Sequence, residues 1–550
     1  MTMLDIAPWQ LGLPHSEWRI YQLEAFDDAQ KALAAHDVVI MEAPVGIGKT
    51  AIAGALSDGT ETTVLVQNLG LLNQYKDYGF SILKGRNEYI CVLDDKVDDW
   101  RRKYGRIPTA GDCHFSHNMH ACPKCDVCPY FIAREEALTS PRMACTYKYG
   151  VVSERLQKRG GLIVMDEIHN AVREFLGIDS FRMTDTERDK YDMPKFPLLD
   201  FGANGDGDVL DQPSLYQILG WSVNALSCVS QINLFDEMSP TGADKRKVFN
   251  AITDLQHLLY AGDEIFYKCK ITETYSKRSG VPIKEPVMEI KALSPKRVYN
   301  RVISGKDSVF MMSATIGDPT ALICNEFGID TWHYKSWPHP VPPDKRPIYN
   351  IADYAMTHTN IMHDPGLYKK QAARIARWIN SYTERDHRGI VLTTSNLKVG
   401  KLREYLGPYL KDGRTTFKLS ERGMGLQDRI NTFVTNSDKG VVHVDTIQGW
   451  GTGVDLRGDI ARYSVVAGVP LPNPVDRFDQ LRFETPEGRA FSYAYAYNSV
   501  MQATGRVTRG EKDDDGTYLL NTGALADMMA TSPLAMRFYS SWFKDAIVKI

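Results

Sequence analysis

Seven short runs of apolar and β-branched residues recur along the 550-residue chain. They are DVVIMEA (37–43), TTVLVQN (62–68), GLIVMDE (161–167), DSVFMMSAT (307–315), GIVLTTS (389–395), VVHVDT (441–446) and YSVVAGVP (463–470). Most of them lack the apolar–polar alternation of a half-exposed strand, which is typical of parallel strands covered on both faces. Helix-like segments such as TAIAGALS and KKQAARIARWINSYTER lie between many of the runs. Strands that alternate with helices predict an α/β architecture.

The bulk composition sets only broad limits. A length of 550 residues, 43% of them hydrophobic, predicts two to four domains with ordinary cores. The net charge of −3 is compatible with a nucleic-acid partner, because a basic groove can lie on a neutral protein. No run approaches the ~18 apolar residues of a membrane-spanning helix, and the N-terminus lacks the pattern of a secretory signal. We therefore expect a cytoplasmic protein without a membrane partner.

The first apolar run leads directly into a glycine-containing turn, in DVVIMEAPVGIGKTAIAGAL (37–56). Gly46 and Gly48 would let backbone N–H groups approach phosphates, and the helix that follows turns its positive end toward them. Lys49 would reach the β- and γ-phosphates of a nucleotide, and the Thr50 hydroxyl would bind Mg²⁺. Ala43 stands where the common pattern has its first glycine. A chance glycine turn is the alternative, which the strand–loop–helix setting disfavours.

The third run ends in two carboxylates, in GLIVMDEIHNAV (161–172). Nucleotides bind outside the carboxyl ends of strands in open α/β sheets, which is where Asp166 and Glu167 would lie. Asp166 would hold Mg²⁺, and Glu167 would orient and deprotonate the attacking water. The alternative is a simple helix cap, which loses weight once the pair is matched with Lys49.

Together, APVGIGKT (43–50) and DEIH (166–169) resemble motifs I and II of the superfamily 2 helicases, with Ile168 in place of the usual Ala. More broadly, the chain resembles the XPD/DinG family of iron–sulfur DNA helicases. The further segments that carry this resemblance are WRIYQ (18–22), LVQNLGLLNQY (65–75), KGRNEYIC (84–91), CPYFIAREEAL (128–138), ACTYKYGVV (144–152), MMSATIGDP (311–319), WGTGVDLRG (450–458) and QATGRVTRGEKDDDG (502–516).

The resemblance implies roles for further residues. Arg19 and Gln22 correspond to a motif on the adenine side of the nucleotide. His169 completes motif II. Asp455 and Gln448 are expected near the cleft between two lobes, although Thr452 replaces the usual Glu of that element.

A last motif supplies arginines from the second half of the chain. Gln502, Arg506 and Arg509 match the family pattern QxxGRxxR. Two arginines three positions apart share one helix face, and their guanidinium groups would stabilise charge on a transferring γ-phosphate. A solvated basic face is the alternative.

Six of the nine cysteines lie between positions 91 and 145, and in a reducing compartment such a cluster predicts a metal site. The resemblance implies a [4Fe–4S] cluster, with Cys91 and Cys128 as its first and last ligands. Cys113, Cys122 and Cys125 remain for two places. The C-x2-C-x2-C run formed by positions 122, 125 and 128 favours Cys122 and Cys125, with Cys113 still a candidate.

Zinc is the competing metal for the same loop. Cys113 with His114, His117, His120 and the cysteine run could supply a tetrahedral Cys/His site. Either group would staple an insertion too small for a good core. Cys145 lies beyond the loop and is expected to be a buried structural thiol.

These observations and the resemblance predict two RecA-like parallel-sheet motor domains with two insertions. The expected divisions are 1–90 with 146–171 and 306–336 for motor domain one, 91–145 for the iron–sulfur domain, 172–305 for a mainly helical arch domain, and 337–550 for motor domain two.

The predicted function is that of an ATP-dependent DNA helicase. The resemblance implies translocation on single-stranded DNA in the 5′→3′ direction and unwinding at duplex/single-strand junctions. It also implies that the protein uses ATP, Mg²⁺ and a [4Fe–4S] cluster and acts as a monomer. Two alternatives are a nucleic-acid-stimulated ATPase that remodels protein–DNA complexes, and a DNA-binding module with an inactive motor.

Overall fold

The computed structural model describes most of the chain. The described residues are 6–93, 97, 102, 105–113, 122–199, 206–230, 240–262, 264–275, 282–351, 354, 356–417, 426–435, 438–450, 456, 460–471, 476–505, 507, 517–521 and 536–548.

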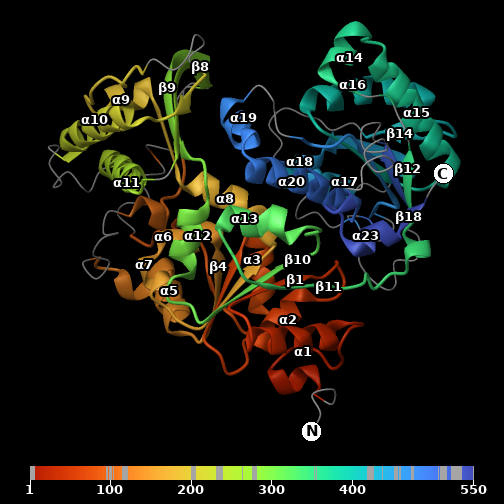
Figure 1. Ribbon diagram of the computed structural model, residues 1–550, viewed down its shortest axis with the longest axis horizontal. Coiled ribbons are helices and arrows are strands. Elements are labelled where there is room, and N and C mark those ends of the chain that lie inside the picture. Colours follow the sequence, from red (N-terminus) through yellow and green to blue (C-terminus); the bar gives the residue numbers. More distant parts are fainter. Residues whose placement is uncertain are drawn as a thin grey trace.

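Lobe one is built around a seven-stranded parallel sheet with the order β11-β1-β10-β5-β2-β4-β3 (Figure 1). Its strands are β1 (Val38–Glu42), β2 (Thr62–Val66), β3 (Ser81–Leu83), β4 (Arg142–Thr146), β5 (Leu162–Asp166), β10 (Ser308–Ser313) and β11 (His333–Ser336). The first four apolar runs all form strands in it, and every neighbouring pair is parallel, as predicted.

Helices cover both faces of this sheet, which explains why β1, β2 and β5 are buried along their whole length. One face packs against α1 (Gln22–Leu33), α2 (Lys49–Leu56) and α3 (Leu69–Lys76) through Phe26, Ile52 and Leu72. The other face packs against a second group of helices. These are α6 (Tyr147–Val152), α7 (Glu154–Gln157), α8 (Ala171–Ile178), α12 (Lys296–Ile303) and α13 (Asn325–Phe327).

Lobe two has its own seven-stranded parallel sheet, in the order β14-β15-β13-β16-β17-β12-β18. Its strands are β12 (Ile348–Ile351), β13 (Gly389–Thr393), β14 (Thr415–Thr416), β15 (Val441–Thr446), β16 (Tyr463–Ala467), β17 (Thr517–Asn521) and β18 (Ile547–Val548). Its helices are α14 (His358–His363), α15 (Leu367–Tyr382), α16 (Asn396–Leu406), α17 (Leu426–Thr435), α18 (Ile447–Trp450), α19 (Arg477–Glu484), α20 (Pro486–Thr504) and α23 (Ser541–Asp545). The last three apolar runs are therefore also strands, as predicted.

The arch insertion combines helices with a sheet that the sequence analysis did not anticipate. The two expected helices are present as α10 (Gln212–Ser230) and α11 (Pro240–Tyr260). They pack with α9 (Asp185–Asp189) on an antiparallel sheet of β6 (Ser180–Thr184), β9 (Pro282–Ala292), β8 (Ile265–Tyr275) and β7 (Asp208–Val209). The end of β9 alternates between buried and partly exposed positions. A search for continuous apolar runs misses such half-exposed strands.

The structure places two domain boundaries differently from the prediction. β4 begins at Arg142 and pairs with β2 and β3 in the sheet of lobe one, so the cysteine insertion ends before residue 142 and not at 145. α12 begins at Lys296 and packs on lobe one, which therefore resumes before residue 306. Short strands and amphipathic helices at the edge of a domain carry a weak sequence signal, and this accounts for both shifts.

The C-terminal segment 536–548 joins the two lobes. β18 extends the sheet of lobe two beside β12. On the lobe-one side, Trp542 Nε1 donates to the Ala314 carbonyl at 3.2 Å, and Arg537 pairs with Asp318 at 2.8 Å. The apolar core consequently runs without interruption from one lobe to the other. None of the helices in the described part of the chain is both long and apolar enough to cross a membrane.

Replacing Trp542 by alanine should weaken the junction between the lobes. The side chain is 6% exposed and packs against His339 and Phe543, with ring centroids 5.3 and 5.8 Å away. We expect a loss of about 3–5 kcal/mol in the free energy of unfolding, measured by urea titration with circular dichroism. Trp9→Ala is the matched control, because Trp9 is 64% exposed. Equal unfolding midpoints for the two variants would show that this contact does not hold the lobes together.

Candidate nucleotide site and cysteine pocket

The turn after β1 has the backbone of a phosphate-binding loop. Gly46 and Gly48 have φ values of +102° and +92°, in the left-handed region that glycine tolerates best. Arg19 Nη1 donates to the Gly46 carbonyl at 3.2 Å, and Gln22 Nε2 donates to the Gly48 carbonyl at 3.1 Å. The loop and the predicted Arg19/Gln22 pair are thus brought together, although they lie on different elements.

Lys49 starts α2 and turns toward the acidic motif. Its Nζ lies 3.4 Å from the Ala43 carbonyl and 3.9 Å from Glu167 Oε1. The two side chains are only 12% and 19% exposed, so the opposite charges interact with limited screening by water. Thr50 follows in the first turn of α2.

Asp166 ends β5 at the same edge of the sheet. Its Oδ2 accepts from Tyr75 Oη at 2.8 Å, its Oδ1 accepts from the Glu167 backbone N–H at 2.9 Å, and its carbonyl accepts from Tyr147 Oη at 2.9 Å. Burial, followed by the neighbouring Glu167 charge, raises the pKa of Asp166 to about 6, while Lys49 and the two hydrogen bonds oppose the shift. Buried acidic groups with a raised pKa are typical of functional sites.

Glu167 has a left-handed backbone, with φ +53°, which is uncommon for a residue with a side chain. Its Oε2 lies 3.3 Å from His169 Nδ1 and 3.4 Å from Ser313 Oγ. His169 Nδ1 in turn lies 2.7 Å from Ser313 Oγ. Ser313 ends β10, the strand between β1 and β5, so three neighbouring strands converge on the acidic pair.

Lobe two reaches the same edge through α20. Gln502 Nε2 donates to Thr315 Oγ1 at 2.6 Å, and Thr315 Oγ1 donates to Asn498 Oδ1 at 3.1 Å. The predicted Gln502 therefore contacts lobe one directly. Gln448 lies exposed on α18. The other three residues predicted from this half of the chain, Asp455, Arg506 and Arg509, lie outside the described residues.

Several residues of this site received no role in the sequence analysis. Ser313 and Thr315 stand in the MMSATIGDP segment, and Tyr75 in LVQNLGLLNQY, so the resemblance located their segments without assigning them contacts. Asn170 and Asn498 carry no motif signal, and only the packing of separate elements brings them to the site.

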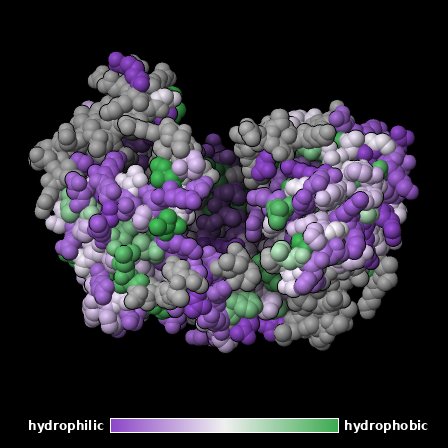
Figure 2. All heavy atoms as spheres, turned by 90° about the horizontal axis from the view of Figure 1, so that it is seen from above, coloured by the Kyte–Doolittle hydropathy of each residue, from purple (hydrophilic) through white to green (hydrophobic). Residues whose placement is uncertain are grey.

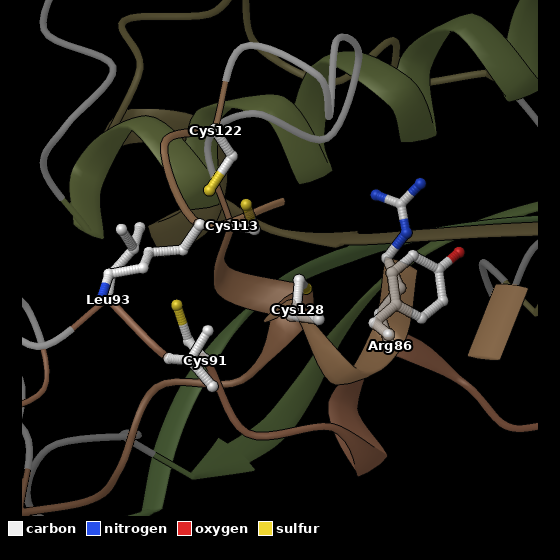
Figure 3. A pocket seen from close by; sticks show the side chains of 10 residues that line it. Arg86, Cys91, Leu93, Cys113, Cys122 and Cys128 are labelled. Atoms are coloured by element: carbon white, nitrogen blue, oxygen red, sulfur yellow. The ribbon is translucent and has the colours of Figure 1, made fainter. Parts of the chain in front are cut away.

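Four of the five candidate cysteines line one pocket (Figure 3). These are Cys91, Cys113, Cys122 and Cys128. Cys125 is not among the lining residues, and its Sγ lies 3.4 Å from Asp126 Oδ1.

Backbone hydrogen bonds fix the segments that carry the pocket cysteines. The Cys91 N–H donates to the Pro108 carbonyl at 2.9 Å, which joins the first cysteine to the 108–113 segment. That segment is held by Asp112, which accepts from Arg106 Nη1 at 2.8 Å and from the Thr109 N–H at 3.0 Å. Cys128 is the N-cap residue of α5 (Pro129–Thr139), and its backbone N–H donates to the Cys125 carbonyl at 3.2 Å.

Within the described residues, no three His, Cys, Asp or Glu side chains lie close enough to share one metal ion. The histidines of the zinc alternative, at 114, 117 and 120, lie outside the described residues.

Cys145 behaves as expected of a structural thiol. It lies in β4 with no exposed surface, and burial raises the pKa of its thiol to about 12. It therefore stays protonated and lies in the hydrophobic core of lobe one.

Comparison with known proteins bears on the fold. A family model described as the helicase C-terminal domain matches residues 379–528. No curated protein sequence matches the chain significantly. Among solved structures, an XPD helicase matches 98% of this chain and 100% of its own length, with a TM-score of 0.60 and 14% sequence identity.

The chain has the XPD helicase fold. An XPD structure without ligand covers 96% of this chain and 100% of its own length, with a TM-score of 0.54 and 13% identity. S. tokodaii Xpd4 covers 93% and 97% respectively, with a TM-score of 0.52 and 12% identity. The expected structural resemblance to XPD helicases, and the fold of two RecA-like domains with insertions, are thereby confirmed.

Gly48→Ala should disable the phosphate loop of this XPD-like fold. A Cβ at this position would come within 2.2 Å of Gln22 Nε2 on a backbone with φ +92°. We expect nucleotide affinity to fall by at least tenfold, measured with a fluorescent ATP analogue. Gly59→Ala is the matched control, since Gly59 also has a positive φ (+68°) but open space around it. If both variants bound nucleotide equally, the loop would not be the phosphate site.

Proposed function

We propose that the chain is an ATP-dependent DNA helicase that moves along single-stranded DNA and separates duplex strands. The helicase C-terminal domain and the XPD-like fold support a helicase in general terms. The observation that carries the proposal is the meeting of Lys49 and Glu167, with Nζ and Oε1 3.9 Å apart at the carboxyl edge of the sheet in lobe one.

Each side chain at this edge would have its own role in ATP hydrolysis. Lys49 would bind the β- and γ-phosphates, with the loop N–H groups around Gly46 and Gly48. Asp166 and Thr50 would hold Mg²⁺, which neutralises charge on the phosphates. Glu167 would accept the proton of the attacking water, and its contact with Lys49 supports this role, because Lys49 would bind the phosphates.

Lobe two would complete the site only when the lobes close. Gln502 and Asn498 already bind Thr315 in lobe one. We propose that Arg506 and Arg509, which follow Gln502 in the sequence, stabilise charge on the γ-phosphate, and that Asp455 contributes at the cleft between the lobes, as the family resemblance implies. Hydrolysis would then depend on the relative position of the lobes, which is the basis of movement along a strand.

A hydrophilic hollow separates the half of the molecule that carries the arch insertion from lobe two (Figure 2). We propose this hollow as the path of the single strand, because phosphates favour a polar, hydrated surface. The 5′→3′ direction, the preference for duplex/single-strand junctions and the monomeric state follow from the family resemblance.

For the cysteine pocket we propose a [4Fe–4S] cluster held by Cys91, Cys113, Cys122 and Cys128. The shared pocket supports this set over one that includes Cys125. A bound cubane would cross-link the small insertion, in whose described residues the buried apolar side chains are Ala110, Tyr130 and Ala137. By the family resemblance, this insertion would lie where the duplex meets the single strand, and the cluster would make it rigid there.

Two alternatives lead to different measurements. An ATPase that remodels protein–DNA complexes would hydrolyse ATP on single-stranded DNA without separating a duplex. An inactive motor would bind DNA and fail to turn over nucleotide. The contact between Lys49 and Glu167 favours an active motor over the second alternative.

Two substitutions test the motor. Lys49→Ala should weaken nucleotide binding and abolish turnover, because it removes the charge that binds the phosphates. Glu167→Gln should retain binding and reduce turnover by at least a hundredfold, because it removes the base. Steady-state ATPase with single-stranded DNA measures both effects. Lys31→Ala and Glu24→Gln, at exposed positions of α1, are the controls. Undiminished turnover in either site variant would contradict the proposed roles.

Single serine substitutions test the ligand set. Serine at position 91, 113, 122 or 128 should remove the visible absorbance of anaerobically purified protein and strand separation, while much of the DNA-stimulated ATPase remains. Cys125→Ser is the internal control and should keep the chromophore. Loss of colour at 125 with retention at 113 would assign the other ligand set. A colourless wild-type protein that contains zinc would exclude the iron–sulfur cluster.

A further inference from the structure

Two hydrogen-bond paths connect the acidic pair of the nucleotide site to one surface segment, residues 67–76. This segment follows β2, which lies next to β5 in the sheet. It begins with Gln67 and Asn68 and continues as α3, whose first turn is capped by Asn68 Oδ1 accepting from the Leu71 N–H at 3.0 Å. The first path ends on Asp166 and the second on Glu167, and both side chains have proposed roles in ATP hydrolysis.

The first path is a single hydrogen bond. Tyr75 Oη donates to Asp166 Oδ2 at 2.8 Å, and both side chains are almost completely buried, at 0% and 3% exposed. Tyr75 is the donor in this bond, because an ionised carboxylate oxygen only accepts. Because Asp166 Oδ1 is engaged by the Glu167 N–H, both carboxylate oxygens are fixed in orientation.

The second path runs through two amides and an imidazole. Asn170 Nδ2 lies 3.0 Å from Gln67 Oε1 and 2.7 Å from His169 Nε2. An amide nitrogen only donates, so His169 Nε2 is the acceptor and Nδ1 carries the proton. That proton points to Ser313 Oγ at 2.7 Å and Glu167 Oε2 at 3.3 Å. The amide of Gln67 therefore helps to set the tautomer of the imidazole that contacts Glu167.

The outer side of the same segment faces solvent. Asn73, Gln74 and Lys76 are exposed, whereas Leu72 and Tyr75 are buried beneath them. The exposed side chains carry amide and ammonium donors, which suit the phosphates of a polynucleotide. The helix α3 thus presents hydrogen-bond donors to the solvent on one side, and on its other side Tyr75 contacts Asp166. A shift of α3 would move Tyr75 with it.

We propose that Tyr75 and Gln67 are positioning residues for ATP hydrolysis, through which a single strand bound on α3 controls the geometry of Asp166 and Glu167. The proposal rests on the helicase function proposed above. Tyr75 would act on the magnesium ligand, and Gln67 on the base through Asn170 and His169. Neither residue would contact the nucleotide.

Tyr75→Phe in the full-length protein tests the first path. It removes one hydrogen bond to a charged group and keeps the ring that fills the core. We expect the kcat of DNA-stimulated ATP hydrolysis to fall by about tenfold, which matches a bond of about 1.4 kcal/mol, with KM for ATP changed less than twofold. The Mg²⁺ concentration for half-maximal activity should rise by several fold. Tyr78→Phe is the matched control, because Tyr78 Oη contacts His15 Nε2 (2.8 Å) and neither acid.

Gln67→Ala and Gln67→Glu test the second path by their pH profiles. Alanine removes the acceptor for Asn170, so Asn170 and the imidazole lose their orientation, and kcat should fall with an altered pH profile. Glutamate keeps the acceptor for Asn170 but loses the donor that Gln67 offers to Glu174, so it should retain more of the wild-type activity and pH profile than alanine does.

The outcomes separate the two proposals. A wild-type protein whose ATPase does not respond to oligothymidylate would refute the proposed function itself. A responsive wild type with normal Mg²⁺ dependence and stimulation in Tyr75→Phe would refute only the positioning role. A drop in thermal stability with kcat and KM affected in parallel would assign Tyr75 a structural role and would also overturn the inference. If Tyr75→Phe does not fold, the two Gln67 variants provide the test. Equal activity and equal pH profiles for these two variants would overturn the inference.

Discussion

A fully buried carboxylate, that of Glu42, joins segments that lie far apart in the sequence. It ends β1, immediately before the phosphate loop, and has no exposed surface. A buried charge is tolerated only when its hydrogen bonds are satisfied. Glu42 accepts from the Ile316 N–H at 2.8 Å, from Tyr334 Oη at 2.5 Å and from the hydroxyl of Ser540. The loop after β10, the strand that leads to lobe two and the C-terminal segment are therefore fastened to the strand that carries the nucleotide loop.

The sequence was sufficient to predict the two parallel sheets, because their strands are continuous apolar runs and the phosphate and acidic motifs follow two of them directly. It was insufficient for the sheet of the arch insertion and for β4, whose residues have no such continuous apolar signal. The positions of Lys49, Asp166 and Glu167 were predictable from local patterns. The contacts of Tyr75, Asn170 and Asn498 were not, because they form between elements that only the folded sheets bring together.

The cysteine loop illustrates the same limit of local spacing. The run at 122, 125 and 128 favoured Cys125 as a ligand, whereas the folded pocket brings in Cys113 from a preceding turn. Cys113 stands at the end of the turn stabilised by Arg106 and Asp112, whose side chains pair at 2.8 Å. The proposed cluster would join three separate segments and would thereby make the insertion more rigid.

The most direct test of this account is strand separation by the wild-type protein on two duplexes that differ only in the polarity of their single-stranded tail. The account predicts that the duplex with a 5′ tail is separated, that the duplex with a 3′ tail is not, and that a non-hydrolysable ATP analogue supports neither reaction. DNA-stimulated ATP hydrolysis without separation of either duplex would contradict the helicase assignment and would favour a remodelling ATPase.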